Sequence, residues 1–546
     1  MRALVPIIVL GVAASVGQAA QPGGLIGGVV RNAWTRQPLR RVAVTLTTTG
    51  ERPLEALTYT DSNGAFAFSG VPQGAYYLSA TLTGYERAVY GARSKNSPAL
   101  PVRLAAGASR TDIVVPMYPL GSISGSVRDE AGEPVPGAEV QLLGPRHRRG
   151  QLAWLPFNRT ITDEQGRYQI PLVQPGSYRV VANKQGEPAL RIRPEVTNGS
   201  PEAQEMYGRQ YYPGVDSSKA AGDLVISAGN EIKDIDFNLP IIRPFRVSGT
   251  VNLPAGDVTP ERSIRVTLQP LDGEIPFRRG FGGMGGVGPD HRFAIPSVLP
   301  GNYRLVAMSF GDETSYRGTK EISVNADMDD VVIDIAAGSP LKGHLKIEGG
   351  TAKASDLEVN LSPGEAGPFG RPPSVEIAED GSFEFDSVVS GIWDIGVNPL
   401  PDGFYIKSMR YGDQDVLDEE MNLEIGNRPA LEIVVSARAA TVEGSVLVEA
   451  GGAKRTRGLV LLAPAEPKDR VLSYYERVSA DADGHFRIKN VTPGRYRLFA
   501  FDELAPDEHQ DANLLKPWLE QTEVFEIGES AVVKRDVAII TRGESR

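Results

Sequence analysis

The stretch TDEQGRYQIPLVQPGSYRV, residues 162–180, decides the fold. It holds a polar turn ending in glycine, then Tyr168, and a second aromatic residue, Tyr178, ten positions later. The phrase occurs five times in 546 residues, with the glycine in four copies and the spacing of ten in all. The aromatic pairs are Phe66/Tyr76, Tyr168/Tyr178, Phe293/Tyr303, Phe383/Trp393 and Phe486/Tyr496. Self-similarity at a long period predicts an array of structural units.

Apolar side chains alternate around each aromatic residue, as in residues 168–170 and 178–180. This is the period of a strand with one buried face. A Pro-Gly pair, here Pro175-Gly176, lies between the two strands. Proline presets φ at the first central position of a turn, and glycine accepts the positive φ that a type II turn needs at the second. The phrase therefore predicts a β-hairpin whose two rings point into a core.

Each unit opens on a glycine about forty residues before its first aromatic residue, which leaves room for about three more strands. The opening glycines are Gly28, Gly125, Gly249, Gly343 and Gly444. Many short strands separated by Gly and Pro turns are typical of β-sandwiches. The sequence therefore predicts an all-β protein, a tandem array of about five Ig-like or prealbumin-like β-sandwich domains after an N-terminal signal peptide.

A chain of 546 residues is too long for one hydrophobic core. Units of about a hundred residues, a usual size for a sandwich domain, account for its length. We expect a signal peptide over residues 1–19 and sandwiches over residues 24–118, 119–242, 243–338, 339–438 and 439–542.

The first residues have the pattern of an export signal. Arg2 supplies a positive charge, residues 4–16 are mainly apolar, and Gly17-Gln18-Ala19 is a small-x-small cleavage site. No later run of about eighteen apolar residues follows. We therefore expect an exported bacterial protein, periplasmic or secreted to the cell surface, with no transmembrane segment in the mature chain.

Composition disfavours two further classes of protein. The net charge is −11 and the pI about 5.3, whereas nucleic-acid binding needs clustered lysine and arginine. The chain has no cysteine, which excludes a disulfide framework and a lipid on a cysteine after the signal. We expect no nucleic acid among the partners.

Residues 134–140, 162–168 and 175–180, after the opening Gly125-Ser126-Val127, carry a family resemblance. Together they resemble the carboxypeptidase regulatory-like domain, a prealbumin-like sandwich akin to Cna protein B-type repeats. Residues 405–408 and 497–500 are also similar to secreted multi-repeat proteins found in soil bacteria such as Acidobacteria. The resemblance implies a carbohydrate-binding-like sandwich fold and no assigned chemistry, because function resides in sites rather than in folds.

Peptidase activity would need zinc ligands that the sequence does not offer. A zinc peptidase of this kind uses a His-x-x-Glu pair and a distant histidine, because three ligands must leave one metal position open. None of the five histidines is followed by glutamate at the third position, and no His-Glu-x-x-His motif occurs. His291 takes a turn position that glycine holds in other copies, and His485 should face outward. We expect no catalytic residues, no metal site and no cofactor.

Two other patterns have a structural explanation. Residues 280–285 match Gly-x-Gly-x-x-Gly but lack the βαβ context of a nucleotide site, which favours a loop. The Asp-rich turns, such as residues 61–64, resemble calcium loops but lack the later bidentate glutamate. Asp and Asn also favour such turns by bonding to their own backbone. Hairpin turns are therefore the preferred interpretation, with calcium as the alternative.

Aromatic side chains in the long variable segments are the candidate ligand-binding residues. Tyr207, Tyr211 and Tyr212 cluster in sandwich 2, and Trp518 lies in the corresponding region of sandwich 5. Tyrosine and tryptophan join a flat apolar face to a polar tip, which suits sugars. The more frequent alternative is that such rings pack the segment onto its own sandwich.

These observations favour a non-catalytic exported scaffold or adhesion-type binding protein of the bacterial cell envelope. The alternative is a polysaccharide-binding protein that uses the loop aromatics. An enzyme with an unrecognised site is a third, disfavoured class, because histidine is scarce and no acid/base pair stands out. The expected partner is a protein or a polysaccharide ligand.

Overall fold

The computed structural model describes most of the chain after residue 22. The described residues are 23–48, 55–92, 97–148, 151–184, 205–254, 264–271, 284–309, 315–363, 373–424, 426, 428–449, 452, 454, 456–466, 474–481, 483–505, 508–510 and 512–541. The expected signal peptide, residues 1–19, lies outside them. No helix of the described residues is long and apolar enough to cross a membrane.

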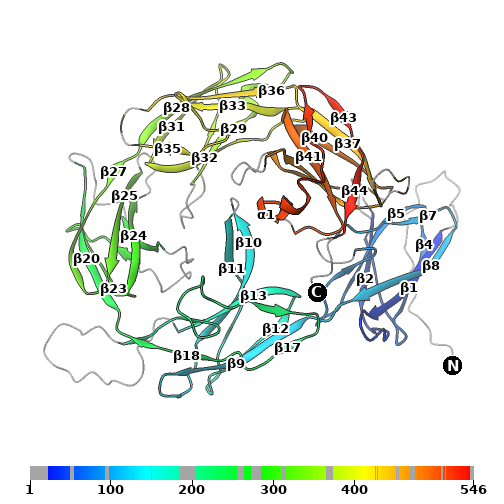
Figure 1. The fold of residues 1–546 in the computed structure, drawn as a ribbon, viewed down its shortest axis with the longest axis horizontal. Coiled ribbons are helices and arrows are strands. Elements are labelled where there is room, and N and C mark those ends of the chain that lie inside the picture. Colours follow the sequence, from blue (N-terminus) through cyan, green and yellow to red (C-terminus); the bar gives the residue numbers. More distant parts are fainter. Residues whose placement is uncertain are drawn as a thin grey trace, which may run out of the picture.

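The protein is an all-β array of sandwiches, each with its own core, arranged in a ring (Figure 1). Sandwich 1 has one sheet of three strands and a second sheet of five. The first holds β4 (Ala65–Val71), β1 (Gly24–Asn32) and β8 (Ser109–Met117). The second holds β3 (Glu55–Tyr59), β2 (Ala43–Thr48), β5 (Gly74–Thr81), β6 (Ala88–Val89) and β7 (Val102–Leu104).

Sandwiches 2 and 3 follow the same plan of two facing sheets. The first sheet of sandwich 2 contains β12 (Arg167–Val173), β9 (Gly121–Asp129), β17 (Glu231–Ile232) and β18 (Phe237–Leu239). The second sheet contains β11 (Gln151–Ile161), β10 (Glu139–Arg148), β13 (Gly176–Asn183), β15 (Gln210–Tyr211) and β16 (Leu224–Ile226). A separate pair is formed by β14 (Met206–Tyr207) and β19 (Ile241–Ile242). In sandwich 3 the strands are β23 (Arg292–Val298), β20 (Phe245–Asn252) and β26 (Met328–Asp334), against β22 (Met284–Gly286), β21 (Arg265–Pro270), β24 (Gly301–Ser309), β25 (Tyr316–Val324) and β27 (Ala336–Ala337).

Sandwiches 4 and 5 complete the ring. In sandwich 4 the strands are β31 (Ser382–Val388), β28 (Ser339–Glu348), β36 (Leu431–Ser436), β33 (Tyr405–Tyr411) and β34 (Gln414–Asp415), against β30 (Ser374–Glu376), β29 (Glu358–Pro363), β32 (Gly391–Asn398) and β35 (Met421–Leu423). In sandwich 5 they are β37 (Ala440–Leu447), β40 (His485–Val491) and β43 (Val532–Lys534), against β39 (Glu476–Ser479), β38 (Leu459–Pro464), β41 (Gly494–Phe501) and β42 (Phe525–Ile527). Strand β44 (Val537–Ile540) pairs with both β37 and β41 and so joins the two layers.

The two aromatic strands of each unit do not form the predicted hairpin. In sandwich 1, β4 pairs with β1 and β5 pairs with β2, so the chain crosses from one sheet to the other at the turn. The hairpin prediction was wrong because each strand finds its backbone partner elsewhere. The prediction of a type II turn was also wrong, since φ is 155° at Gly176 and Gly301, whereas a type II turn needs a value near 80°. Both rings still face one core, from opposite layers, and Phe66 and Tyr76 are 3% and 2% exposed.

The second aromatic residue of every unit secures this crossing through its polar tip. Its hydroxyl or indole nitrogen donates a hydrogen bond to the carbonyl oxygen four residues earlier. The pairs are Tyr76 to Pro72 at 2.7 Å, Tyr178 to Gln174 at 3.0 Å, Tyr303 to Leu299 at 3.0 Å, Trp393 to Val389 at 3.1 Å and Tyr496 to Thr492 at 2.7 Å. The bond satisfies a turn carbonyl and brings the ring over the turn glycine, as at Gly494, where the tyrosine ring lies 3.2 Å from an added Cβ.

Each opening glycine lies where the last strand of the unit comes closest to the first. A Cβ added to Gly125 would lie 2.0 Å from the carbonyl oxygen of Ile235, and one added to Gly444 would lie 1.7 Å from that of Arg535. The first and last strands pair in parallel, as β1 and β8 do, with a register shift next to Gly28. Glycine is required here because two backbones approach too closely for any side chain.

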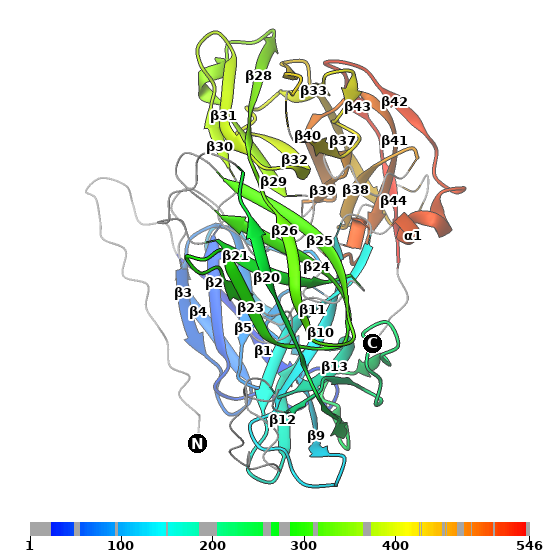
Figure 2. The same cartoon turned by 90° about the vertical axis from the view of Figure 1, so that its left-hand side faces the viewer.

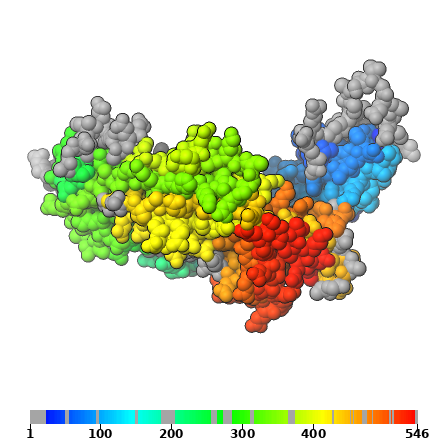
Figure 3. Space-filling view, turned by 90° about the horizontal axis from the view of Figure 1, so that it is seen from above, coloured from blue at the N-terminus to red at the C-terminus, as the bar shows by residue number. Residues whose placement is uncertain are grey.

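The five sandwiches close on themselves, so that sandwich 1 lies beside sandwich 5 (Figures 1 and 2). Figure 3 shows these two at one end of the molecule and sandwich 3 at the other. Strands β10 and β11 of sandwich 2 point into the ring, toward helix α1 (Ala512–Leu515) of sandwich 5 (Figure 1). The protein is therefore a ring with a cross-connection rather than an open string of domains.

Candidate functional site

The four candidate aromatic residues pack against their own sandwiches. Tyr207 and Tyr211 are 7% and 3% exposed, and Tyr207 belongs to the core of sandwich 2. Tyr212 is half-buried against the same core. Trp518 is half-buried in sandwich 5, with its ring centre 5.4 Å from that of Phe501 in an edge-on contact. The area of these rings is thus used mainly in packing, which leaves little flat surface on which a sugar could stack.

Tyr211 belongs to a small second core on the outer face of sandwich 2. Its members are Leu143, Val181, Tyr211 and Ala221, with Trp154 and Val215 at the edge. Arg179, next to the core residue Tyr178, holds this layer in place. Its guanidinium lies 4.2 Å from the Trp154 ring centre, pairs with Asp223 at 2.7 Å and donates to the carbonyl oxygen of Ser218. A segment that the sequence offered as a binding loop therefore covers a sheet of its own domain.

Sandwich 5 repeats this arrangement with a helical cover. The outer core contains Leu459, Leu461, Ala463, Tyr475, Phe499, Phe501, Leu504 and Leu515, with Trp518 at its edge. Arg497, in the position that corresponds to Arg179, donates to the carbonyl oxygens of Ala465 at 3.2 Å, Leu519 and Thr522. The segment around α1 is thus fixed to the sheet by the hydrogen bonds of Arg497 and by the apolar contacts of Leu515 and Trp518 with the outer core.

Sandwiches 4 and 5 meet at an ionic cluster centred on Glu529. Its carboxylate accepts hydrogen bonds from the Tyr405 hydroxyl at 3.0 Å and from Arg438 at 3.1 Å. The Lys407 ammonium lies 3.4 Å from Glu529 and 2.7 Å from Glu348. These bonds, that of Arg438 first, lower the pKa of Glu529, and the bond to Glu348 raises the pKa of Lys407. No sequence pattern indicates this cluster, because its members lie far apart along the chain.

The other joints between neighbouring sandwiches use backbone hydrogen bonds. The backbone N–H of Leu120 donates to the carbonyl oxygen of Gly84 at 2.9 Å, across the joint between sandwiches 1 and 2. Between sandwiches 3 and 4, Arg317 donates to the carbonyl oxygen of Ser390 at 2.6 Å, and the Ser387 hydroxyl accepts from a backbone N–H. Such bonds need fixed distances, so they hold neighbouring sandwiches in one orientation.

The ring closes through a smaller contact between sandwiches 1 and 5. The guanidinium of Arg103 on β7 lies 2.8 Å from the carboxylate of Asp483, and the two side chains are 60% and 58% exposed. Next to this pair, Tyr77 on β5 interacts with Arg457. Burial lowers the pKa of Arg457 below its usual value, and the opposing effects of Tyr77 and Asp481 do not offset it. We call this contact the seam; it consists of Tyr77 and Arg103 against Arg457 and Asp483.

A second contact crosses the ring. Strand β10 of sandwich 2 touches the short 3-10 helix η3 (Glu508–Gln510) of sandwich 5. Tyr475 lies under this helix, with its ring centre 6.2 Å from that of His509. Sandwich 5 therefore contacts sandwiches 1, 2 and 4 and is the member that holds the ring together.

The Asp-rich turns use their carboxylates within the turn. In sandwich 1, the Asp61 carboxylate accepts from the backbone N–H groups of Asn63 and Ala65, both at 2.8 Å. Asp163 and Asp481 make the same pair of bonds two and four residues ahead. These contacts support the turn interpretation of the motif. Within the described residues, no group of three or more His, Asp or Glu side chains could hold a metal ion.

Three of the five histidines lie in three different sandwiches. His291 of sandwich 3 has a φ of 61°, the left-handed conformation that glycine adopts at this turn in other copies. His485 of sandwich 5 is exposed, as predicted, and its Nδ1 lies 3.1 Å from the Ser445 hydroxyl. His344 lies in sandwich 4.

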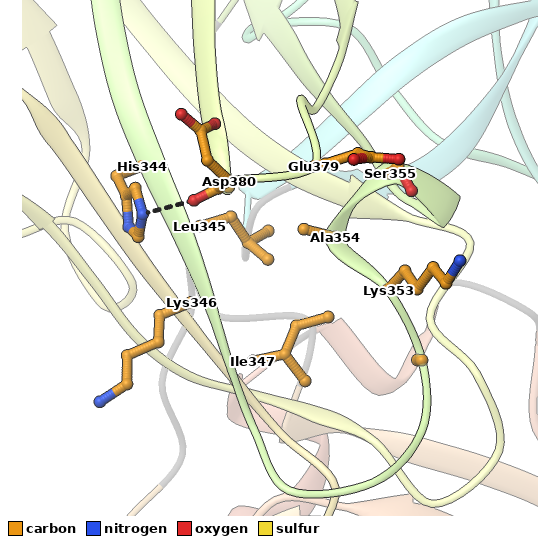
Figure 4. Close-up of a pocket in the computed structure, with 11 residues that line it drawn as sticks. His344, Leu345, Lys346, Ile347, Lys353, Ala354, Ser355, Glu379 and Asp380 are labelled. Carbon is orange, nitrogen blue, oxygen red and sulfur yellow. Dashed lines mark hydrogen bonds between the residues drawn. The ribbon is translucent and has the colours of Figure 1, made fainter.

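A shallow hollow of about 510 Å³ lies beside β28 of sandwich 4. His344, the short helix η1 (Ala354–Asp356) and the turn at Asp380 line it (Figure 4). The His344 Nε2 atom lies 3.0 Å from the carbonyl oxygen of Asp380, whereas Ser355 lies on the other side of the hollow (Figure 4). The Asp380 carboxylate is engaged by Ser382, whose hydroxyl is 2.6 Å away and lowers the pKa of Asp380. The Ser355 hydroxyl and the His344 imidazole therefore lie on opposite sides of the hollow (Figure 4).

Glu476 on β39 is the acid with the most perturbed titration. Burial raises the pKa of Glu476 to about 7. Burial also raises the pKa of Tyr496, and the charges of Tyr474 and Glu476 raise it further. A carboxyl that titrates near neutrality is a common feature of active sites, but structural acids behave in the same way. Glu476 lies in the wall of sandwich 5, beside the core tyrosine, which favours a structural role.

Gly280 to Gly283 of the glycine-rich motif lie outside the described residues. The remainder, Met284 to Gly286, forms strand β22 and pairs with β21. A phosphate site of the nucleotide-binding kind needs a helix N-terminus after its glycines. The chain enters a sheet here instead.

The carboxypeptidase regulatory-like domain family matches residues 26–115 and 122–206, within sandwiches 1 and 2. The resemblance seen in the sequence is thereby confirmed for these two units. No curated protein matches the sequence.

Similar solved structures include a TIE protein and two pilins. The match to the TIE protein of Bacillus anthracis covers 76% of this chain and 73% of the TIE chain, with 11% identity and a TM-score of 0.15. A minor pilin of Streptococcus agalactiae covers 43% and 99%, with 14% identity and a TM-score of 0.22. The shaft pilin SpaA of Lactobacillus rhamnosus GG covers 40% and 97%, with 11% identity and a TM-score of 0.21. At these TM-scores the similarities carry no inference about function.

Proposed function

We propose that this chain, whose first two units match the carboxypeptidase regulatory-like domain, is a non-catalytic exported scaffold of the bacterial cell envelope. Its role is to hold outer surfaces of five sandwiches in a fixed arrangement toward a protein or polysaccharide partner. The observation that carries the proposal is the contact of sandwich 5 with both of its ring neighbours, through the Glu529 cluster and through the seam. An enzyme needs one assembled site, whereas a scaffold needs fixed distances between many surfaces.

The geometry of the chemical groups supports a binding role. The Asp163 carboxylate is engaged in a turn and the Glu529 carboxylate in a joint between sandwiches. The arginines next to the core tyrosines, Arg179 and Arg497, fix covering segments rather than face an open site. Rigid cover and rigid joints suit a protein that presents surfaces.

Small-angle scattering on the purified chain tests the scaffold. In scattering extrapolated to zero concentration we expect a single compact ring at neutral pH, with a maximum dimension well below that of five sandwiches in a line. Binding is then measured to cell-wall sacculi, to outer-membrane fractions and to a polysaccharide array, with released product assayed in the same samples. Retention without turnover supports the proposal, and hydrolysis by clean protein, or an extended string of domains in solution, contradicts it.

The polysaccharide alternative has a separate test. Tyr212 and Trp518 keep partly exposed surface at the edges of their cores. The variants Tyr212→Ala and Trp518→Ala should weaken retention on a polysaccharide that these rings bind. The matched control is Trp34→Ala, because Trp34 is 58% exposed and lies outside both segments.

A further inference from the structure

One sheet of sandwich 1 has an outer face that sandwich 5 covers along only one side. Tyr77 on β5 and Arg103 on β7 point outward there and form the seam. On the same face, two strands away from β5, strand β3 presents Leu57 and Tyr59, which are 40% and 51% exposed. The face thus continues from an existing interface onto exposed apolar side chains.

The corresponding face is covered in two other sandwiches. In sandwich 2 the segment around Tyr211 and Ala221 lies on it, and in sandwich 5 the segment around α1 does. In the described part of sandwich 1, the face is built from Thr45, Ser79 and Tyr77 between the exposed residues of β3 and the seam. Leu57 and Tyr59 offer this face apolar area to a further domain, while Glu55 on the same strand and Arg87, which donates to Ser79, lie among its charged groups.

The ion pair of the seam is weak. It joins two side chains that are more than half exposed, and exposed pairs contribute little stability, so the contact of Tyr77 with the partly buried Arg457 is the stronger part of the seam. The joint between sandwiches 4 and 5, by contrast, has several charged groups around one carboxylate. The seam is therefore closed largely because sandwiches 2 to 4 keep its two sides close, which acts as a high effective concentration.

We propose that this face of sandwich 1 is a docking surface for sandwich 5 of a second copy of the chain. The seam joins two different surfaces, so the same contacts can form between copies. Within one ring, the position of sandwich 5 is set by its joint with sandwich 4. Sandwich 5 of a second copy has no such constraint and covers Leu57 and Tyr59 as well as the seam. The inference concerns self-assembly and does not depend on the ligand of the proposed scaffold.

Single cysteines test whether the contact forms between copies, because the natural chain has none. Arg103→Cys and Asp483→Cys are purified separately, mixed and treated with a bis-maleimide cross-linker. We expect a covalent dimer from the mixture and an internally linked monomer from the double variant at low concentration. The control mixture pairs Asp483→Cys with Asp112→Cys, an equally accessible position on the other sheet with 72% side-chain exposure. A mixture that gives no more dimer than this control overturns the proposal.

The apolar part of the surface has its own test. Tyr59→Ser should weaken self-association about tenfold in sedimentation velocity, because the buried ring area is lost. Val114→Ser is the matched control, since Val114 is 49% exposed on β8 of the other sheet and should change association less than twofold. Circular dichroism establishes that both variants are folded. A wild-type chain that stays monomeric up to high micromolar concentration, or equal effects of the two variants, contradicts the inference.

Discussion

The hydroxyl of Tyr496 donates a 2.7 Å hydrogen bond to the carbonyl oxygen of Thr492, four residues earlier. Tyr496 is 2% exposed and Thr492 is half-buried, so the bond lies at the edge of the core. Tyr496→Phe keeps the ring and removes the bond. We expect sandwich 5 to lose about 0.5–1.5 kcal/mol of stability, the usual net contribution of one hydrogen bond.

Urea unfolding of the purified chain, followed by circular dichroism, measures this loss. The control is Tyr59→Phe, whose ring is half exposed and whose removal of a hydroxyl should change stability by less than about 0.5 kcal/mol. Equal effects of the two substitutions would show that the repeated bond does not stabilise the crossing.

Gly444→Ala should prevent sandwich 5 from folding. The new Cβ would lie 1.7 Å from the carbonyl oxygen of Arg535, whose backbone is held beside β37 by a 2.9 Å hydrogen bond from its N–H to the carbonyl oxygen of Glu443. We expect a loss on the order of 4 kcal/mol or more, in the range that only strong steric conflicts reach. Gly528→Ala is the matched control, because no atom lies within 4 Å of its added Cβ. A folded Gly444→Ala chain with normal urea resistance would sink the close-approach explanation.

Glu476 should make sandwich 5 less stable at alkaline pH. Burial raises the pKa of Glu476 to about 7, above the 4.5 of a free glutamate. The folded state therefore favours the protonated form, and stability falls as the pH rises from about 4.5 through 7. Glu476→Gln should raise stability at pH 8 by roughly 2 kcal/mol and change it little at pH 4.5.

Thermal unfolding at several pH values, followed at sandwich 5, measures this difference. Glu526→Gln is the control, since it makes the same chemical change at an exposed residue of β42. A stabilisation by Glu476→Gln that is the same at pH 4.5 and pH 8 would contradict a raised pKa.

The joint between sandwiches 4 and 5 should loosen in acid. The pKa of Glu529 is lowered by the hydrogen bonds from Arg438 and Tyr405. The contribution of this carboxylate to the joint is therefore present above the pKa of a free glutamate and is lost as the pH falls through the lowered value. Glu529→Gln should mimic the acid form at neutral pH.

Spin labels on engineered cysteines, one in each of sandwiches 4 and 5, report the distance across the joint. We expect a broader distance distribution for Glu529→Gln at pH 7 and for the wild type at low pH. Glu526→Gln, which changes the same charge away from the joint, should leave the distribution narrow. No broadening in Glu529→Gln would show that the joint is held by other contacts.

The sequence was sufficient to predict sandwiches, because alternation around residues such as Tyr168 and Tyr178 states which side chains face inward. It did not predict which strands pair. Val71 and Gly74 are separated by two residues, a spacing that fits a hairpin as well as a crossing between sheets. The crossing forms because β4 pairs with β1 and β5 pairs with β2, and these partner strands lie elsewhere in the unit.

The contacts between sandwiches could not be predicted from the sequence for a similar reason. Arg103 and Asp483 are charged residues at exposed positions, like many others in the chain, and only the ring places them 2.8 Å apart. The aromatic candidates show the opposite case. Tyr207 and Tyr211 were identified from their clustering, and burial of both rings reflects the general tendency of aromatic area to leave water.

The parallel pairing of first and last strands sets an order for biosynthesis. No unit can complete its sheet until its final strand is available, since β1 waits for β8 and β37 waits for β44. A chain that emerges from its N-terminal side therefore finishes its domains one after another, each before the next has all its strands. Sandwich 5 is the last of the five to mature, and the ring cannot close before it has done so.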